Sequence, residues 1–273
     1  MRQYFRRHIA ITNEHGSWVF LLSPLLIGLF AGGNWTIPML YLIVAALAGF
    51  LVRHPIVIIV KIYSGRRSRK DLPAARFWIL TYGFVGLLMV AGLVLRGYGY
   101  VLLLVLPGLP VFGWHLWLVS RRSERHQAGV EIVASGFLAL SAPAAYWISL
   151  GWPDPAGWWL WGLSWLQSAA SIVYAYLRLE QREWKVLPEW KSRLRSGWRA
   201  LLYTSFNLAF TLIFSIWSKL PFWLFLPYLL QWCETLWGTM NPAIGVRPAQ
   251  IGVRQLIVST LFTILFIIAW KIP

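Results

Sequence analysis

Apolar residues along this chain fall into long tracts, each bounded by charged residues, Pro or Gly. A helix needs roughly 20 mostly apolar residues to cross a bilayer, and the tracts have about that length. The pattern therefore predicts an all-α, polytopic transmembrane helical bundle of about nine spans, forming a single domain over residues 1–273. The expected spans lie near 17–33, 36–52, 77–95, 98–119, 128–150, 156–177, 200–218, 221–240 and 251–270.

The second span has an uncertain end, because Ile56 to Val60 is again apolar after Pro55. A helix tolerates Pro within a membrane when neighbouring groups satisfy the freed carbonyl. The span is thus expected to end either near residue 52 or as far along as Tyr63.

The connections between the tracts alternate sharply in charge. Of the 25 Lys and Arg residues, 22 lie in five segments that would share one side of the membrane. By the positive-inside rule, the N-terminus is expected to be cytoplasmic and the C-terminus outside. The five segments are 1–16, 53–76, 121–125, 178–199 and 247–254.

Composition supports the membrane assignment, since 58% of the residues are hydrophobic and only 12% are charged. The net charge of +16 suits anionic lipid head groups, so membrane lipids are expected partners and nucleic acid is not. The single cysteine, Cys233, excludes an internal disulfide, and no spacing of ligands suggests a metal site.

A polar cluster, Asn13-Glu14-His15-Gly16, stands at the cytoplasmic entrance of the first span. Its carboxylate could simply complement the helix dipole. Alternatively, Glu14 orients His15 for proton transfer at the mouth of a cytoplasmic pocket, which makes both residues candidate catalytic groups.

Basic residues interleave with apolar ones at the end of the second span. Arg53, His54 and Lys61 would suit a phosphate or carboxylate head group, although a positive-inside stop signal also places charge there. At the end of the sixth span, Arg178, Glu180 and Arg182 either form pairs along the helix or make a second polar wall at the same depth.

Two acidic residues lie inside predicted spans, where an ionisable group is costly and indicates a functional site. Glu131 is the third candidate catalytic residue, and it is close enough to the cytoplasmic face to pair with Arg121, Arg122 or Arg125. Glu234 is expected to be a protonated or hydrogen-bonded packing residue, or an ion carrier. Carboxylates in the basic loops, such as Asp71, are expected to form exposed ion pairs.

Three features together resemble the YwiC-like family of bacterial integral membrane proteins. They are the Glu14-His15-Gly16 entrance followed by Trp18 and Pro24, the Arg-rich segment before Glu131, and the Tyr-X-X-X-Arg ending at Arg178. The resemblance covers most of the chain and implies topology more than activity. It also implies a multi-pass location in a bacterial inner (cytoplasmic) membrane or another internal membrane.

The order of spans and long cytoplasmic loops is also distantly similar to the UbiA-type intramembrane prenyltransferases. Those enzymes hold Mg²⁺ on a prenyl diphosphate through Asp-rich motifs after spans two and six. Here the second span is followed by no carboxylate before Asp71, and the sixth by Glu180 and Glu183 without aspartate. Hard cations need clustered oxygen ligands, so Mg²⁺ is not expected and the cofactor stays unassigned.

Three functions remain open from these patterns. The first is a UbiA-like prenyl or lipid transferase, or a binding protein, for an isoprenoid, quinone or other lipid. The second is a transporter that uses Glu131 and Glu234, and the third a non-catalytic assembly or scaffold protein with a membrane protein partner. For the first, the candidate catalytic residues are Glu14, His15 and Glu131, and the candidate substrate-binding residues are Arg53, His54, Lys61, Arg122, Arg178 and Glu180.

Overall fold

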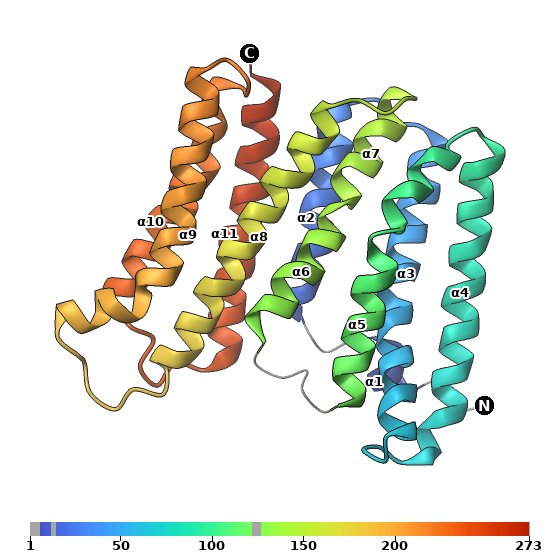
Figure 1. The fold of residues 1–273 in the computed structure, drawn as a ribbon, viewed down its shortest axis with the longest axis horizontal. Helices are drawn as coiled ribbons and strands as arrows, with labels where there is room; N and C mark the ends of the chain where they lie inside the picture. The colour runs from blue at the N-terminus through green and yellow to red at the C-terminus, as the bar shows by residue number, and fades with distance from the viewer. Residues whose placement is uncertain (1–5, 12–14, 122–126, 273) are drawn as a thin grey trace.

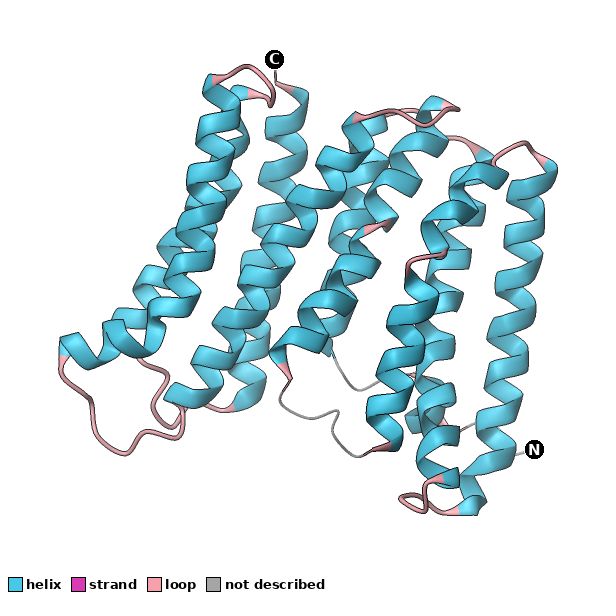
Figure 2. Cartoon of the chain, in the orientation of Figure 1, coloured by secondary structure: helices cyan, strands magenta, loops and turns pink. Residues whose placement is uncertain are grey.

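The computed structural model describes residues 6–11, 15–121 and 127–272, and every regular element in these ranges is a helix (Figures 1 and 2). The predicted all-α class is therefore confirmed. In chain order the elements are α1 (Arg7–Ala10), α2 (His15–Gly32), α3 (Ile37–Tyr63), η1 (Arg69–Asp71), α4 (Leu72–Leu95), η2 (Gly99–Val105), α5 (Gly108–Ser120), α6 (Ala128–Ala139), α7 (Ser141–Leu150), α8 (Ala156–Gln181), α9 (Trp190–Ile216), η3 (Phe222–Leu224), α10 (Phe225–Met240) and α11 (Pro248–Lys271).

Each of the nine apolar tracts is helical in the structure. The second continues through Pro55 to Tyr63 as one helix, so the longer of its two expected ends is correct. Three tracts are divided: the fourth into η2 and α5, the fifth into α6 and α7, and the eighth into η3 and α10.

Six helical segments in the described part of the chain are long and apolar enough to cross a membrane, so the chain is a multi-pass membrane protein. The helix Ser17–Gly32 is apolar but shorter, α10 has only 16 residues, and α8 interleaves polar with apolar positions. The count of nine spans therefore stays a prediction. The six segments are Ile37–Tyr63, Arg69–Leu95, Gly99–Ser120, Ala128–Leu150, Trp190–Ile216 and Pro248–Lys271.

Local sequence explains where several helices start and stop. Thr36 is an extended N-cap and is followed by Pro38 in the first turn of α3, while Pro248 opens α11. Pro suits these positions because the first amide groups of a helix have no partner within it. Gly33 and Gly151 end α2 and α7 at φ angles of 80° and 90°, which glycine adopts without steric cost.

The connections lie at two opposite ends of the bundle. The α3–α4, α8–α9 and α10–α11 connections share one end, which we call the basic end, and the C-terminus lies at the other (Figure 1). The alternation predicted from the charges is thus seen in the arrangement of the helices.

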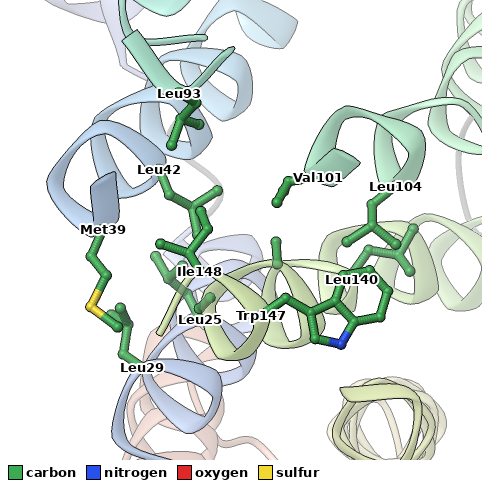
Figure 3. Packing of buried hydrophobic residues seen from close by; sticks show 12 residues of the cluster. Leu25, Leu29, Met39, Leu42, Leu93, Val101, Leu104, Leu140, Trp147 and Ile148 are labelled. Atoms are coloured by element: carbon green, nitrogen blue, oxygen red, sulfur yellow. The ribbon is translucent and has the colours of Figure 1, made fainter. Parts of the chain in front are cut away.

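The chain forms two packed regions. The N-terminal region, α1 to α7, is organised by the α3–α4 and α2–α7 pairs, and its core is an apolar cluster shown in Figure 3. The C-terminal region, α8 to α11, is organised by the α9–α10, α8–α9 and α10–α11 pairs. The two regions are joined where α6, α7 and α2 pack against α8 and where α2 packs against α11. An apolar cluster around Tyr228 and Phe262 lies at this junction.

Candidate functional site

A cavity of about 750 Å³ opens at the basic end of the C-terminal region, between α8, α10, α11 and the α10–α11 connection. Apolar side chains, Val253 and Ile257 of α11 among them, form much of its wall. We call this cavity the basic-end pocket. Its polar and aromatic lining residues are Tyr174, Arg178, Glu234, Trp237, Asn241, Gln250, Arg254 and Gln255.

Arg178 is the buried cation of the basic-end pocket. It sits in the last turn of α8 with 6% of its surface exposed. Its Nη1 donates to Gln181 Oε1 at 2.9 Å, and to the backbone oxygens of Gly238 at 2.6 Å and Asn241 at 2.7 Å. Among the described residues its hydrogen bonds therefore all go to neutral oxygens, and they leave the Nε and Nη2 donors for a ligand.

Arg254 and Glu234 form an ion pair that also lines the pocket. Arg254 donates from Nε to Glu234 Oε1 at 2.6 Å and from Nη2 to Oε2 at 2.8 Å, a bidentate arrangement. The guanidinium carbon also lies 3.7 Å from the centroid of the Trp237 ring. The Tyr174 hydroxyl donates to Glu234 Oε1 at 2.8 Å, so the carboxylate is held from two helices.

The interior of the C-terminal region is polar along α8. Polar residues recur there at steps of three or four, which places them on one helix face. Of the 18 buried polar side chains in the described part of the chain, 14 belong to the C-terminal region. The positions on this face are Ser164, Gln167, Ser168, Ser171, Tyr174, Arg178 and Gln181.

The sequence-predicted residues of α3 lie in the N-terminal region. The Arg53 guanidinium stands 5.6 Å from the Phe50 ring, and His54 Nε2 donates to the backbone oxygen of His8 at 3.2 Å. Both residues and Lys61 are half-buried. This part of α3 packs against α1 and α4, and neither Arg53 nor Lys61 lines the basic-end pocket.

Glu131 and Glu180 also lie away from the basic-end pocket. Glu131 is exposed near the start of α6 and accepts a hydrogen bond from the Tyr176 hydroxyl at 2.8 Å. Glu180 is exposed at the end of α8. Tyr176 follows Tyr174 by two positions on α8, so Glu131 and Glu234 are held on different sides of this helix.

The remaining candidates cannot be placed in the site. Glu14 and Arg122 lie outside the described residues, and only the backbone of His15, the first residue of α2, is described. Of the predicted binding residues, Arg178 lines the pocket. The three on α3, which are Arg53, His54 and Lys61, lie in the N-terminal region, beyond α2, α6 and α7 in Figure 1. The catalytic and binding roles assigned to these residues stay predictions.

Asp71 forms ion pairs as expected, but the prediction that they are exposed is wrong. It is 9% exposed and accepts hydrogen bonds from Arg6 Nη1 at 2.6 Å and Arg67 Nε at 2.7 Å. The segment before α2 folds back over α3 and α4, with Ile9 buried against Ile58, and this covers the carboxylate.

Sequence reasoning missed Arg254, Trp237 and Gln255 as members of one site. Arg254 was counted as a loop charge, and Trp237 is one of 19 tryptophans that suit a membrane interface. The one signal in the sequence was the polar periodicity of α8, which identifies a buried face but not the helices that meet it. No group of three or more His, Cys, Asp or Glu side chains in the described residues could hold a metal ion.

Comparison with known proteins gives a family match for the N-terminal half of the chain. A family model described as YwiC-like protein matches residues 11–146. The chain is 26% identical over 186 residues to the "Uncharacterized protein YwiC" of Bacillus subtilis (strain 168), which covers 66% of this chain and 71% of that protein. No solved structure matches the chain.

The resemblance to the YwiC-like family is confirmed, and the UbiA-type likeness stays a prediction. The family match ends before α8, so it does not include the basic-end pocket.

Proposed function

Since this chain belongs to the YwiC-like family of membrane proteins, we propose that it binds an amphiphile with an anionic phosphate or carboxylate head group in the basic-end pocket. The head group would contact Arg178 and Arg254 at the cytoplasmic side. The hydrophobic chain would leave the pocket along α11.

The observation that carries this proposal is the buried Arg178. A guanidinium removed from water is costly unless it is paired, and neutral oxygens compensate only part of its charge. The pocket is lined by two guanidinium groups, Arg178 and Arg254, and by one carboxylate, Glu234, which pairs with Arg254, so its charged groups carry one net positive charge. An anion would balance that charge through the free donors of Arg178.

The apolar wall supports an amphiphile over a small soluble anion. Val253 and Ile257 line the pocket and are more than half exposed. Further along the same helix, Leu261, Ile264 and Ile268 are exposed at steps of three or four residues. A lipid chain could therefore extend from the pocket into the bilayer along one face of α11.

The proposal narrows the functions predicted from the sequence. An isoprenoid, quinone or other lipid could be the amphiphile. A UbiA-like enzyme would, in addition, transfer a prenyl or lipid group from the ligand bound in this pocket. For transport through Glu131 and Glu234, both carboxylates would have to line one path. Only Glu234 lines the basic-end pocket, and the exposed Glu131 lies on another side of α8. The scaffold hypothesis has no specific contact in its favour.

The test compares farnesyl phosphate with farnesol as probes, since they share a chain and differ in the anionic group. Ligands that bind the folded state raise the thermal midpoint of unfolding. We expect the purified wild type in detergent to be stabilised by farnesyl phosphate and hardly by farnesol. Arg178→Gln should weaken the phosphate response at least about tenfold, because a hydrogen bond to a charged group is lost.

Arg193→Gln is the matched control. Arg193 also lies at the basic end and donates to backbone oxygens, those of Pro188 and Met240, but it does not line the pocket. This variant should respond like the wild type. Equal binding of the two probes by the wild type, or an unchanged response in Arg178→Gln, would overturn the proposal.

A further inference from the structure

A second, much smaller cavity continues from the basic-end pocket toward the middle of the bundle. Its volume is about 20 Å³, and it shares Tyr174, Glu234 and Gln255 with the pocket. Its other polar lining residues are Ser171 of α8, Gln231 and Thr235 of α10, and Ser259 of α11. We call this cavity the inner chamber.

Gln231 presents an unused acceptor at the inner chamber. Its side chain is 5% exposed, and its Nε2 donates to the backbone oxygen of Gln167 and to Ser171 Oγ, both at 3.0 Å. The bond to a carbonyl fixes which end of the amide is nitrogen. Gln231 Oε1 is therefore an acceptor, and it is buried with no partner in the described residues.

Gln255 of α11 lines the same chamber with a second amide group. Its Nε2 is likewise buried without a hydrogen-bond partner in the described part of the chain. Each such group costs free energy, and more so at membrane depth, where no bulk water can satisfy it. Two amide groups, each with one buried atom that has no partner among the described residues, thus line one cavity whose volume is about that of a single water.

We infer that the inner chamber is a binding subsite for one hydroxyl group, which donates to Gln231 Oε1 and accepts from Gln255 Nε2. A hydroxyl fits because it both donates and accepts within the space of one oxygen atom. The hydroxyl belongs either to the head group of the bound amphiphile or to an ordered water. The first source rests on the function proposed above, and the second does not.

The first experiment uses two probes that differ by one hydroxyl: 1-oleoyl-glycerol 3-phosphate and oleoyl propanediol phosphate, which lacks the central hydroxyl. If the hydroxyl comes from the amphiphile, the wild type should bind the first about tenfold more tightly. Gln255→Met should bind the two equally. This substitution keeps the side-chain length and removes an amide nitrogen that has no described partner, so folding should be preserved.

Ser164→Ala is the matched control. Ser164 Oγ is also buried without a partner in the described residues, but it lines neither cavity. The variant should keep the wild-type preference between the two probes. Loss of the preference in Ser164→Ala as well would assign the effect of Gln255→Met to general packing and overturn the amphiphile as the source.

The second experiment is a high-resolution cryo-electron microscopy map of the wild type without probe. One density within hydrogen-bonding distance of both amides, absent in Gln255→Met, would assign the hydroxyl to water. An empty chamber together with equal binding of the two probes would refute the subsite. If neither probe binds the wild type, the proposed function fails, and the map still decides the inner chamber.

Discussion

The N-terminal and C-terminal regions both pack helices together in a bilayer, but they differ in the polarity of the side chains that they bury. The core of the N-terminal region is a cluster of apolar side chains such as Leu25, Met39 and Ile148, and its described part holds four buried polar residues (Figure 3). The C-terminal region buries 14 polar side chains and contains both cavities. All four buried side-chain atoms found without a partner among the described residues belong to it.

This difference indicates that the N-terminal region mainly stabilises the fold, whereas the C-terminal region contains the candidate binding site. Helix association in a membrane depends on close packing and hydrogen bonds, since lipid chains are as apolar as the helix surface. A close-packed apolar core holds helices together without needing any ligand. Buried polar groups left unsatisfied cost stability and therefore suggest a functional site. The family match covers the close-packed region, so family membership by itself says little about the pocket.

The largest expected effect is on the packing of the N-terminal region. A Cβ atom at Gly28 would collide with the backbone of Ala142, where α2 crosses α7. Because backbone cannot move aside cheaply, Gly28→Ala should destabilise the fold by about 3 kcal/mol. Thermal unfolding followed by fluorescence-detected size exclusion would measure the loss. Gly83→Ala, where a Cβ meets nothing within 4 Å, should be neutral or slightly stabilising.

The second prediction concerns the charge balance of the basic-end pocket. Glu234→Gln removes the partner of Arg254 and leaves two arginines lining the pocket. The variant should be destabilised by about 1 kcal/mol, since Arg254 is partly exposed and solvent screens the pair. It should nevertheless bind farnesyl phosphate about tenfold more tightly, because a repelling charge is lost.

Titration of the thermal shift with farnesyl phosphate separates these two effects. Glu180→Gln is the control, because Glu180 is exposed on α8 and does not line the pocket. Weaker phosphate binding in Glu234→Gln would show that the carboxylate contacts the ligand favourably, and the charge argument would then be wrong.

The smallest effect is expected at Asp71. Asp71→Asn weakens the hydrogen bonds from Arg6 and Arg67 and removes the opposite charge, at a cost of about 1 kcal/mol for a site at the edge of the bundle. Binding of farnesyl phosphate should not change, because Asp71 lies in the N-terminal region, away from the pocket. A change in affinity comparable to that of Glu234→Gln would mean that the two regions are coupled.

Helix positions followed from the sequence with few errors. Apolar tracts bounded by Pro, Gly and charge predicted all nine helical segments, because each depends on residues that are neighbours in the chain. The exceptions are local interruptions, such as the break between α6 and α7 at Leu140, which no apolar pattern marks. The burial of Asp71 was missed for a different reason, since it depends on Arg6, 65 positions away.

What the sequence determined by itself is the class of protein, the helical tracts and the placement of most positive charge at one end, because these depend on composition and local periodicity. It also contained the polar face of α8. Only the tertiary structure decided that this face meets α10 and α11, so that Arg178 lines one pocket with Glu234 and Arg254, while Arg53 and Lys61 lie in another region. Periodicity fixes the direction in which a side chain leaves its helix, and the neighbour that it meets depends on how all the helices pack.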